Sequence, residues 1–231
     1  MAVKKIETPR GFFFVGQLQH ALLLVALVPG AFWIAEPALS DGSFLGVPDR
    51  TWFLASIAVP IVHQIVVWLA FRAQLVASLF TRIFGKLDMV VWGLLFFPLL
   101  ILRPVTTIGI AVADGRSLGG PPALLITIGV LLLLPVTYTM WSIARFFGFG
   151  RALGGDHFRQ HYRDTPLVKK GAFRYSSNAM YTYAFLALWS IALLTQSRAA
   201  LATALFQHAY IWVHMYCTEE PDMRLIHGAT G

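Results

Sequence analysis

The chain has 231 residues, of which 57% are hydrophobic and 13% are charged, and its formal net charge is +7. Soluble domains carry roughly 25% charged residues, so this composition excludes an ordinary soluble protein and indicates an integral membrane protein. The single cysteine, Cys217, excludes a disulfide framework and a cysteine-based metal cluster. The length fits one membrane domain, residues 1–231.

Six segments approach the roughly 20 apolar residues that a helix needs to cross a membrane. They are residues 12–35, 52–71, 89–111, 123–147, 180–197 and 199–217. The first is long and has no small-residue cleavage pattern after it, so we expect a retained helix rather than a signal peptide. Only Arg198 and its polar neighbours separate the last two, which predicts a tight antiparallel hairpin. The sequence therefore predicts an all-α polytopic membrane helix bundle with five to six transmembrane helices.

Lysine and arginine are distributed unequally between the two sides of this bundle. With the N-terminus inside, 14 of the 18 fall on the inner side, Lys4 and Lys5 among them. The outer side receives Arg50, Arg103, Arg116 and Arg198. Cytoplasmic loops carry the excess of these residues, so we expect both termini in the cytoplasm, at the cell inner membrane. Topology and anionic lipids account for the positive charge, and no nucleic acid partner is needed.

The longest polar connection, residues 145–181, reads RFFGFGRALGGDHFRQHYRDTPLVKKGAFRYSSNAMY. We expect N-terminal transmembrane helices in residues 1–122 and a C-terminal core in residues 123–231, which contains this segment and a last hairpin at 180–222. On the predicted topology this segment shares a membrane face with the adjacent Glu219 and Glu220. Glycines expose N–H donors, aromatic rings cover bases or cations, and carboxylates neutralise an ammonium or a sulfonium. S-adenosylmethionine presents an adenine, a sulfonium, an ammonium and a carboxylate to such residues. The spacing of the residues alone does not single out this ligand.

The fragments HYRDTPLVKKGAFRYSSNAMY and EEPDM resemble the signature shared by phospholipid methyltransferases and isoprenylcysteine carboxyl methyltransferases. SNAMY and TEEP are more similar to the phosphatidylethanolamine N-methyltransferase branch, as is the GFG at residues 148–150. The resemblance covers about a third of the chain, roughly residues 145–228. Ala179 stands where the family usually has proline, and Ser177 where the carboxyl methyltransferases usually have arginine.

The resemblance implies a site for S-adenosylmethionine formed by the cytoplasmic loop and the C-terminal hairpin. The residues that it assigns to the cofactor are Gly148, Gly150, His161, Leu167, Val168, Gly171, Tyr175, Asn178, Tyr181, Glu219 and Glu220. For Leu167, Val168 and Gly171 the contacts are through the backbone. An aromatic belt at the membrane interface is the alternative role for Tyr175 and Tyr181.

Glu219, Glu220 and His214 are the candidate catalytic residues. Adjacent carboxylates on a helix point about 100° apart, so one is expected to contact the cofactor and the other the substrate amine. The alternative is a hydrated helix end, where acidic residues at a C-terminus oppose the helix dipole. Lys169, Lys170 and Arg174 are expected either to bind a lipid phosphate or to be ordinary residues of the positive inner face.

His157 and His161 are four residues apart, which would place both on one face of a helix. A metal ion would need further ligands, and Asp156 and Asp164 are the only near candidates, so no metal site is predicted. His157 is interpreted as a solvated loop residue. His63 is interpreted as a hydrogen-bonded residue between helices.

These observations lead to the hypothesis of methyl transfer from S-adenosylmethionine to the amine of a phospholipid headgroup, with phosphatidylethanolamine as first choice. The lipid would come from the bilayer and the cofactor from the cytoplasm. An isoprenylcysteine-type carboxylate, a small thiol or another lipid acceptor is the enzymatic alternative. A small transporter or channel is the non-enzymatic one, but it predicts polar residues along several spans, whereas here they concentrate in one loop.

Overall fold

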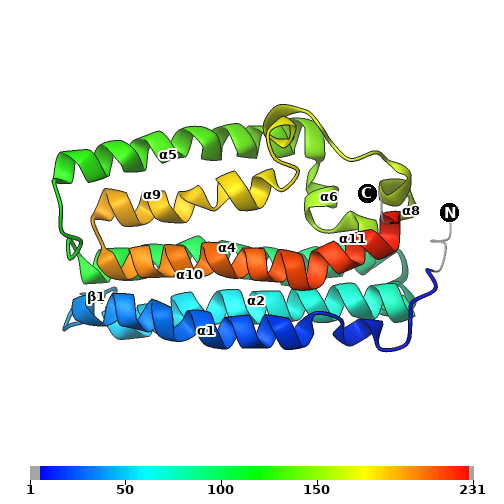
Figure 1. Cartoon of the computed structure of the whole chain (residues 1–231), viewed down its shortest axis with the longest axis horizontal. Helices are drawn as coiled ribbons and strands as arrows, with labels where there is room; N and C mark the ends of the chain where they lie inside the picture. Colours follow the sequence, from blue (N-terminus) through cyan, green and yellow to red (C-terminus); the bar gives the residue numbers. More distant parts are fainter. Residues whose placement is uncertain (1–5, 229–231) are drawn as a thin grey trace.

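The computed structural model describes residues 6–228 as a bundle of helices with one small β-hairpin. Figure 1 shows the long helices running side by side along the length of the molecule. The long helices are α1 (Gln17–Ala35), α2 (Asp49–Ala77), α4 (Asp88–Asp114), α5 (Pro122–Ser142), α9 (Leu186–Thr195) and α10 (Arg198–His214). The short elements are α3 (Leu79–Phe84), α6 (Phe149–Ala152), α7 (Gly155–Phe158), α8 (Gln160–Asp164), α11 (Glu220–His227), β1 (Ser43–Phe44) and β2 (Val47–Pro48). The expected cytoplasmic residues Lys4 and Lys5 lie outside the described residues.

Within residues 6–228, four helical stretches are long and apolar enough to cross a membrane. They are Phe12–Ala38, Asp49–Ala77, Leu79–Asp114 and Pro122–Phe147. The fifth expected span is a shorter apolar helix, Met180–Thr195, and the sixth corresponds to α10. The prediction of an all-α polytopic bundle is confirmed.

Proline residues lie inside the long helices without ending them. They are Pro29 in α1, Pro60 in α2, Pro98 and Pro104 in α4, and Pro135 in α5. Neighbouring helices and local adjustments can satisfy the backbone groups that a proline leaves free in a membrane helix.

Helix α10 lies at the centre of the bundle and packs against α1, α2, α4 and α9. Small residues make this packing close: Ala199, Ala200, Ala202 and Ala204 are fully buried. Small side chains let membrane helices approach one another, where the hydrophobic effect gives no driving force. Helix α5 lies apart from α10 and packs against α9 (Figure 1).

The hairpin of α9 and α10 forms as predicted. Gln196 adopts a left-handed conformation with φ of 58° and ends α9. The Ser197 hydroxyl then accepts a hydrogen bond from the Ala200 N–H at 2.9 Å and caps α10. This cap satisfies one of the free N–H groups at the helix start.

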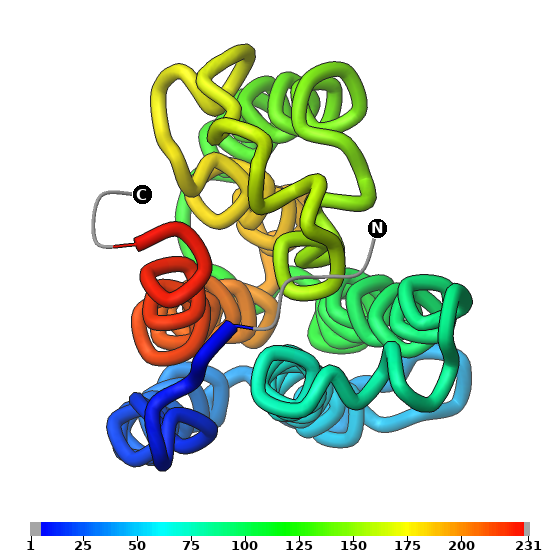
Figure 2. Tube along the Cα trace, turned by 90° about the vertical axis from the view of Figure 1, so that its right-hand side faces the viewer, coloured from blue at the N-terminus to red at the C-terminus, as the bar shows by residue number. Residues whose placement is uncertain are grey.

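Segment 145–181 and the C-terminal helix α11 meet at one end of the bundle, which Figure 2 views end-on. The β-hairpin lies at the opposite end (Figure 1). One residue of the topology count is misplaced: Arg103 does not lie in an outer loop. It lies within α4 and is only 3% exposed. The assignment of lysine and arginine to the two sides placed every such residue in a loop. Arg103 is instead buried between helices.

Candidate active site

Three π-helical turns within residues 6–228 lie at the end of the bundle that holds α11. Ile143–Phe147 follows α5, Met180–Ala184 precedes α9, and Met215–Glu219 joins α10 to α11. π-helical turns are rare and frequently mark functional sites, because they move side chains out of the regular helical register. Two of the turns contribute Tyr181 and Glu219, which contact each other.

The Tyr181 hydroxyl lies 2.5 and 2.6 Å from the two carboxylate oxygens of Glu219. The Nε2 atom of His214 lies 3.5 Å from Oε1 of Glu219, without the geometry of a directed hydrogen bond. His214 is fully buried, whereas the Glu219 side chain keeps 25% of its surface exposed. Next to this group, Gln17 Nε2 donates to Thr218 Oγ1 at 3.1 Å. The structure therefore joins two predicted catalytic residues, Glu219 and His214, with one predicted cofactor residue, Tyr181.

Burial raises the pKa of Glu219 above its ordinary value, against the opposing effect of the hydrogen bond from Tyr181. A desolvated carboxylate is a stronger base than one in water, because water no longer stabilises its charge. Glu219 is thus a stronger candidate for a general base than an ordinary surface carboxylate.

Glu220 points elsewhere and forms an ion pair with Arg224, one helical turn further on. The predicted divergence of the two adjacent carboxylates is confirmed. The expectation of a helix C-terminus at these residues is wrong, because the helical backbone continues from η7 (Met215–Glu219) into α11. Glu220 lies in the first turn of α11 with Pro221, a position where proline is tolerated.

A buried ion cluster fixes the helix that carries Glu219. Arg72 Nε lies 2.5 Å from one oxygen of Asp222, and His157 Nε2 lies 3.1 Å from the other. Arg72 also donates to the carbonyl oxygen of Thr218 at 3.3 Å, and the His157 ring stacks on Phe71 with centroids 3.8 Å apart. All three charged members are at most 1% exposed. The interpretation of His157 as a solvated residue is therefore wrong, and sequence reasoning missed both Arg72 and Asp222.

The two histidines of the cytoplasmic segment do not share a helix face. Arg159 is extended, with φ of −133° and ψ of 128°, and it separates α7 from α8. His161 is exposed to solvent on α8, whereas His157 is buried. Across residues 6–228 no group of three histidine, cysteine or acidic side chains is placed to hold a metal ion.

The three glycines assigned to the cofactor differ in their surroundings. Gly148 has φ of +85°, and a Cβ built there meets nothing within 4 Å, so its backbone faces open space. A Cβ on Gly150 would lie 2.1 Å from the Tyr162 hydroxyl oxygen, and one on Gly171 would lie 2.4 Å from Ser142 Oγ. Gly150 and Gly171 thus allow close packing of the segment, while Gly148 leaves room for a ligand.

The remaining predicted residues lie at the surface or within the segment. Leu167 and Tyr175 are 47% and 70% exposed, and Val168 packs against the cluster around Ala172 and Phe173. The carbonyl oxygen of Asn178 accepts a hydrogen bond from the Thr182 hydroxyl at 3.1 Å. The three residues expected at a lipid phosphate, Lys169, Lys170 and Arg174, are all exposed.

Comparison with known protein families gave a match in the C-terminal half of the chain. Residues 124–230 match the family model described as phospholipid methyltransferase. Comparison with curated proteins and with solved structures gave no match. The matched stretch runs from α5 to α11 and includes Tyr181, His214 and Glu219, whereas α1, α2 and α4 precede it. Residues 124–230 of this chain of apolar helices are therefore similar to the phospholipid methyltransferase family.

Proposed function

We propose that the protein transfers methyl groups from S-adenosylmethionine to the amine of a phospholipid headgroup, with phosphatidylethanolamine as the acceptor. The observation that carries the proposal is the partly exposed Glu219 carboxylate, which has a raised pKa and is held by Tyr181 within the stretch that matches the family model. An amine acceptor requires such a base, whereas a carboxylate or thiolate acceptor does not.

The residues present fit a bound S-adenosylmethionine. The Gly148 backbone faces open space at the end of η4 (Ile143–Phe147), and Glu219 supplies a negative charge for an ammonium or a sulfonium. Both ring nitrogens of His214 are buried without a hydrogen-bond partner, as expected where a polar ligand completes the site. The wider set of cofactor contacts proposed from the family likeness is Gly150, His161, Leu167, Val168, Gly171, Tyr175, Asn178, Tyr181 and Glu220.

The bound cofactor supplies a methyl group that is activated by a positively charged sulfur. The task of the protein is to present a neutral amine to it. A primary amine has a pKa near that of lysine, about 10.4, so it is mostly protonated at neutral pH. Glu219 accepts this proton, Tyr181 holds the carboxylate in place, and His214 lies 3.5 Å from it. These residues would orient the amine toward the methyl donor, and orientation would supply most of the acceleration.

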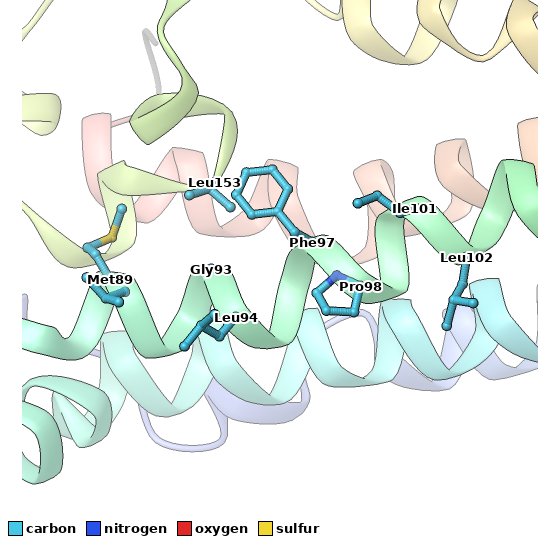
Figure 3. Close-up of a pocket in the computed structure, with 9 residues that line it drawn as sticks. Met89, Gly93, Leu94, Phe97, Pro98, Ile101, Leu102 and Leu153 are labelled. Carbon is cyan, nitrogen blue, oxygen red and sulfur yellow. The ribbon is translucent and has the colours of Figure 1, made fainter.

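An apolar groove along α4 offers a path for the acyl chains of the lipid. It has a cavity volume of about 750 Å³. Its lining residues are Met89, Val90, Gly93, Leu94, Phe97, Pro98, Ile101, Leu102 and Leu153. Figure 3 shows Leu153, from the segment 145–181, close to Phe97 of α4. We infer that acyl chains lie against α4 while the headgroup enters between the helices and the cofactor enters from the cytoplasm.

The proposed function also includes an orientation of the protein in the membrane. Both ends of the described chain lie on the side of segment 145–181, where most lysine and arginine residues gather. We propose that this side faces the cytoplasm across the cell inner membrane. Lys169, Lys170 and Arg174 then face the anionic headgroups of the inner leaflet.

The experiment that tests the function is incubation of the purified protein with labelled S-adenosylmethionine and a total lipid extract, followed by lipid mass spectrometry. The expected products are mono-, di- or trimethylated ethanolamine lipids. Label found on a thiol or a carboxylate in place of the amine would reject phosphatidylethanolamine as the acceptor. Failure to bind labelled S-adenosylmethionine would reject methyl transfer from this cofactor to any of the acceptors considered.

A further inference from the structure

Arg103 lies in the interior of α4 without an acidic partner. It is 3% exposed, and its Nε and Nη2 atoms have no hydrogen-bond partner. Among the described residues, the groups that act on its charge with opposite sign are the hydroxyls of Tyr210 and Tyr181, and no carboxylate is among them. Ionisable residues within membrane helices are costly, and they mark functional sites by default.

The surrounding packing compensates only a small part of this cost. The Arg103 guanidinium lies over the Phe185 ring, 5.1 Å from its centroid. A cation–π contact is weaker than the penalty for removing a charge from water. Nearby, both ring nitrogens of His63 are also buried without a partner, and the ring packs against Phe96. Buried donors are normally paired, so this interior is suited to a ligand that accepts hydrogen bonds.

Arg103 and the active-site carboxylate are linked through two aromatic side chains. The Phe185 ring beneath Arg103 lies 6.4 Å from the Tyr181 ring, whose hydroxyl contacts Glu219. Helix α4 begins at the end of the bundle that holds this site, and helical side chains point back toward the helix start. A chain of contacts through Phe185 and Tyr181 therefore connects Arg103 with Glu219, and these two residues provide a positive and a negative pole.

We propose that Arg103 binds the phosphodiester of the acceptor lipid while Glu219 binds its amine. This inference rests on the proposed function and adds the residue that recognises the headgroup. A zwitterionic ethanolamine headgroup carries a cation and an anion two carbons apart, which matches two opposite poles. The guanidinium fork fits two phosphate oxygens, and the groove residue Leu102 precedes Arg103 directly. The exposed Lys169, Lys170 and Arg174 lie in water, where screening weakens their attraction.

The test measures lipid binding rather than turnover. Phosphatidylethanolamine and a phosphate-free aminoethyl ether of the same diglyceride are titrated into the purified full-length protein and followed by native mass spectrometry. The wild type is expected to prefer the phospholipid, and Arg103→Gln is expected to raise its Kd roughly 10- to 100-fold without changing binding of the ether. Arg82→Gln is the matched control, because it removes an exposed arginine without an assigned binding role and should retain the preference. Inorganic phosphate should not displace the lipid.

Several results would overturn the inference. Equal binding of phosphatidylethanolamine by the wild type and a folded Arg103→Gln protein would show that the guanidinium does not hold the phosphate. Loss of S-adenosylmethionine binding with an unchanged lipid preference would assign the anion to the cofactor carboxylate instead. Displacement by inorganic phosphate would show a general anion site. If Arg103→Gln does not fold, Arg103→Lys retains the charge without the fork, and an unchanged preference in that variant rejects the proposal. A wild type that binds the lipid but methylates nothing refutes the proposed function alone.

Discussion

The Tyr181 hydroxyl donates to the carboxylate of Glu219 across 38 positions of sequence, with oxygen–oxygen distances of 2.5 and 2.6 Å. The contact joins the π-helical turn before α9 to the one after α10, so it closes the inner end of the hairpin. On the proposed mechanism, it makes Glu219, rather than Glu220, the carboxylate of the site.

Glu219→Gln retains the shape of the side chain and removes its ability to accept a proton. General-base catalysis contributes about 10²- to 10⁴-fold, so we expect kcat to fall by at least about 100-fold. Initial rates of labelled methyl transfer measure this loss. Glu220→Gln is the comparison variant: at saturating cofactor its kcat should stay within about twofold, because Glu220 is proposed to contact the cofactor alone and its surface pair with Arg224 contributes little. Equal losses in both variants would contradict the separate roles.

Tyr181→Phe removes the hydrogen bond that lowers the pKa of Glu219 and leaves burial to raise it further. Because the charged carboxylate is the active form, activity should rise with pH as Glu219 loses its proton. The acidic limb of the kcat profile should therefore move to higher pH in the variant. A pH–rate series on both proteins measures the shift. A limb that stays in place or moves to lower pH would show that Glu219 does not control this ionisation.

Asp222→Asn should destabilise the protein strongly, because it leaves Arg72 buried without its carboxylate partner. Breaking a buried ion pair costs about 3–5 kcal/mol of the free energy of unfolding. Denaturant titration in detergent, followed by circular dichroism, measures the change. Glu36→Gln breaks the exposed pair with Arg50 and should cost at most about 1 kcal/mol. Similar costs for the two variants would show that the buried cluster does not stabilise this end of the bundle.

The proposed orientation predicts which positions react with a membrane-impermeant maleimide. Lys169→Cys and Arg174→Cys should react only in inverted membrane vesicles, and Arg116→Cys should react only in intact spheroplasts. Native Cys217 is buried, so background labelling should be low. The opposite pattern would place segment 145–181 outside the cell, away from the cytoplasmic cofactor.

The length of the apolar segments predicts the helices, and Arg198 between two of them predicts the hairpin. Both signals are local in the sequence. The pair of glutamates is recognisable for the same reason, since TEEP is a short contiguous motif. Arg72, His157 and Asp222 carry no local signal. Asp222 lies 65 positions from His157 in sequence, and only the folded bundle makes them partners.

Two other features have tertiary causes. Arg103 interrupts an apolar run and is assigned to a loop by charge counting, but neighbouring helices enclose it. The π-helical turn at Met215–Glu219 adjusts the register of the helix and directs Glu219 toward Tyr181. No residue preference within the turn predicts its π-helical geometry. In both cases packing between helices decides the position of a functional side chain.

The most direct measurement uses vesicles of phosphatidylethanolamine, the purified protein and S-adenosylmethionine with a deuterated methyl group. Headgroup mass spectrometry then locates the transferred group, and binding of the cofactor is measured on the same preparation. The proposed function predicts a deuterated methyl group on the ethanolamine nitrogen for the wild type and almost none for Glu219→Gln. Bound cofactor without any label on that nitrogen would contradict it.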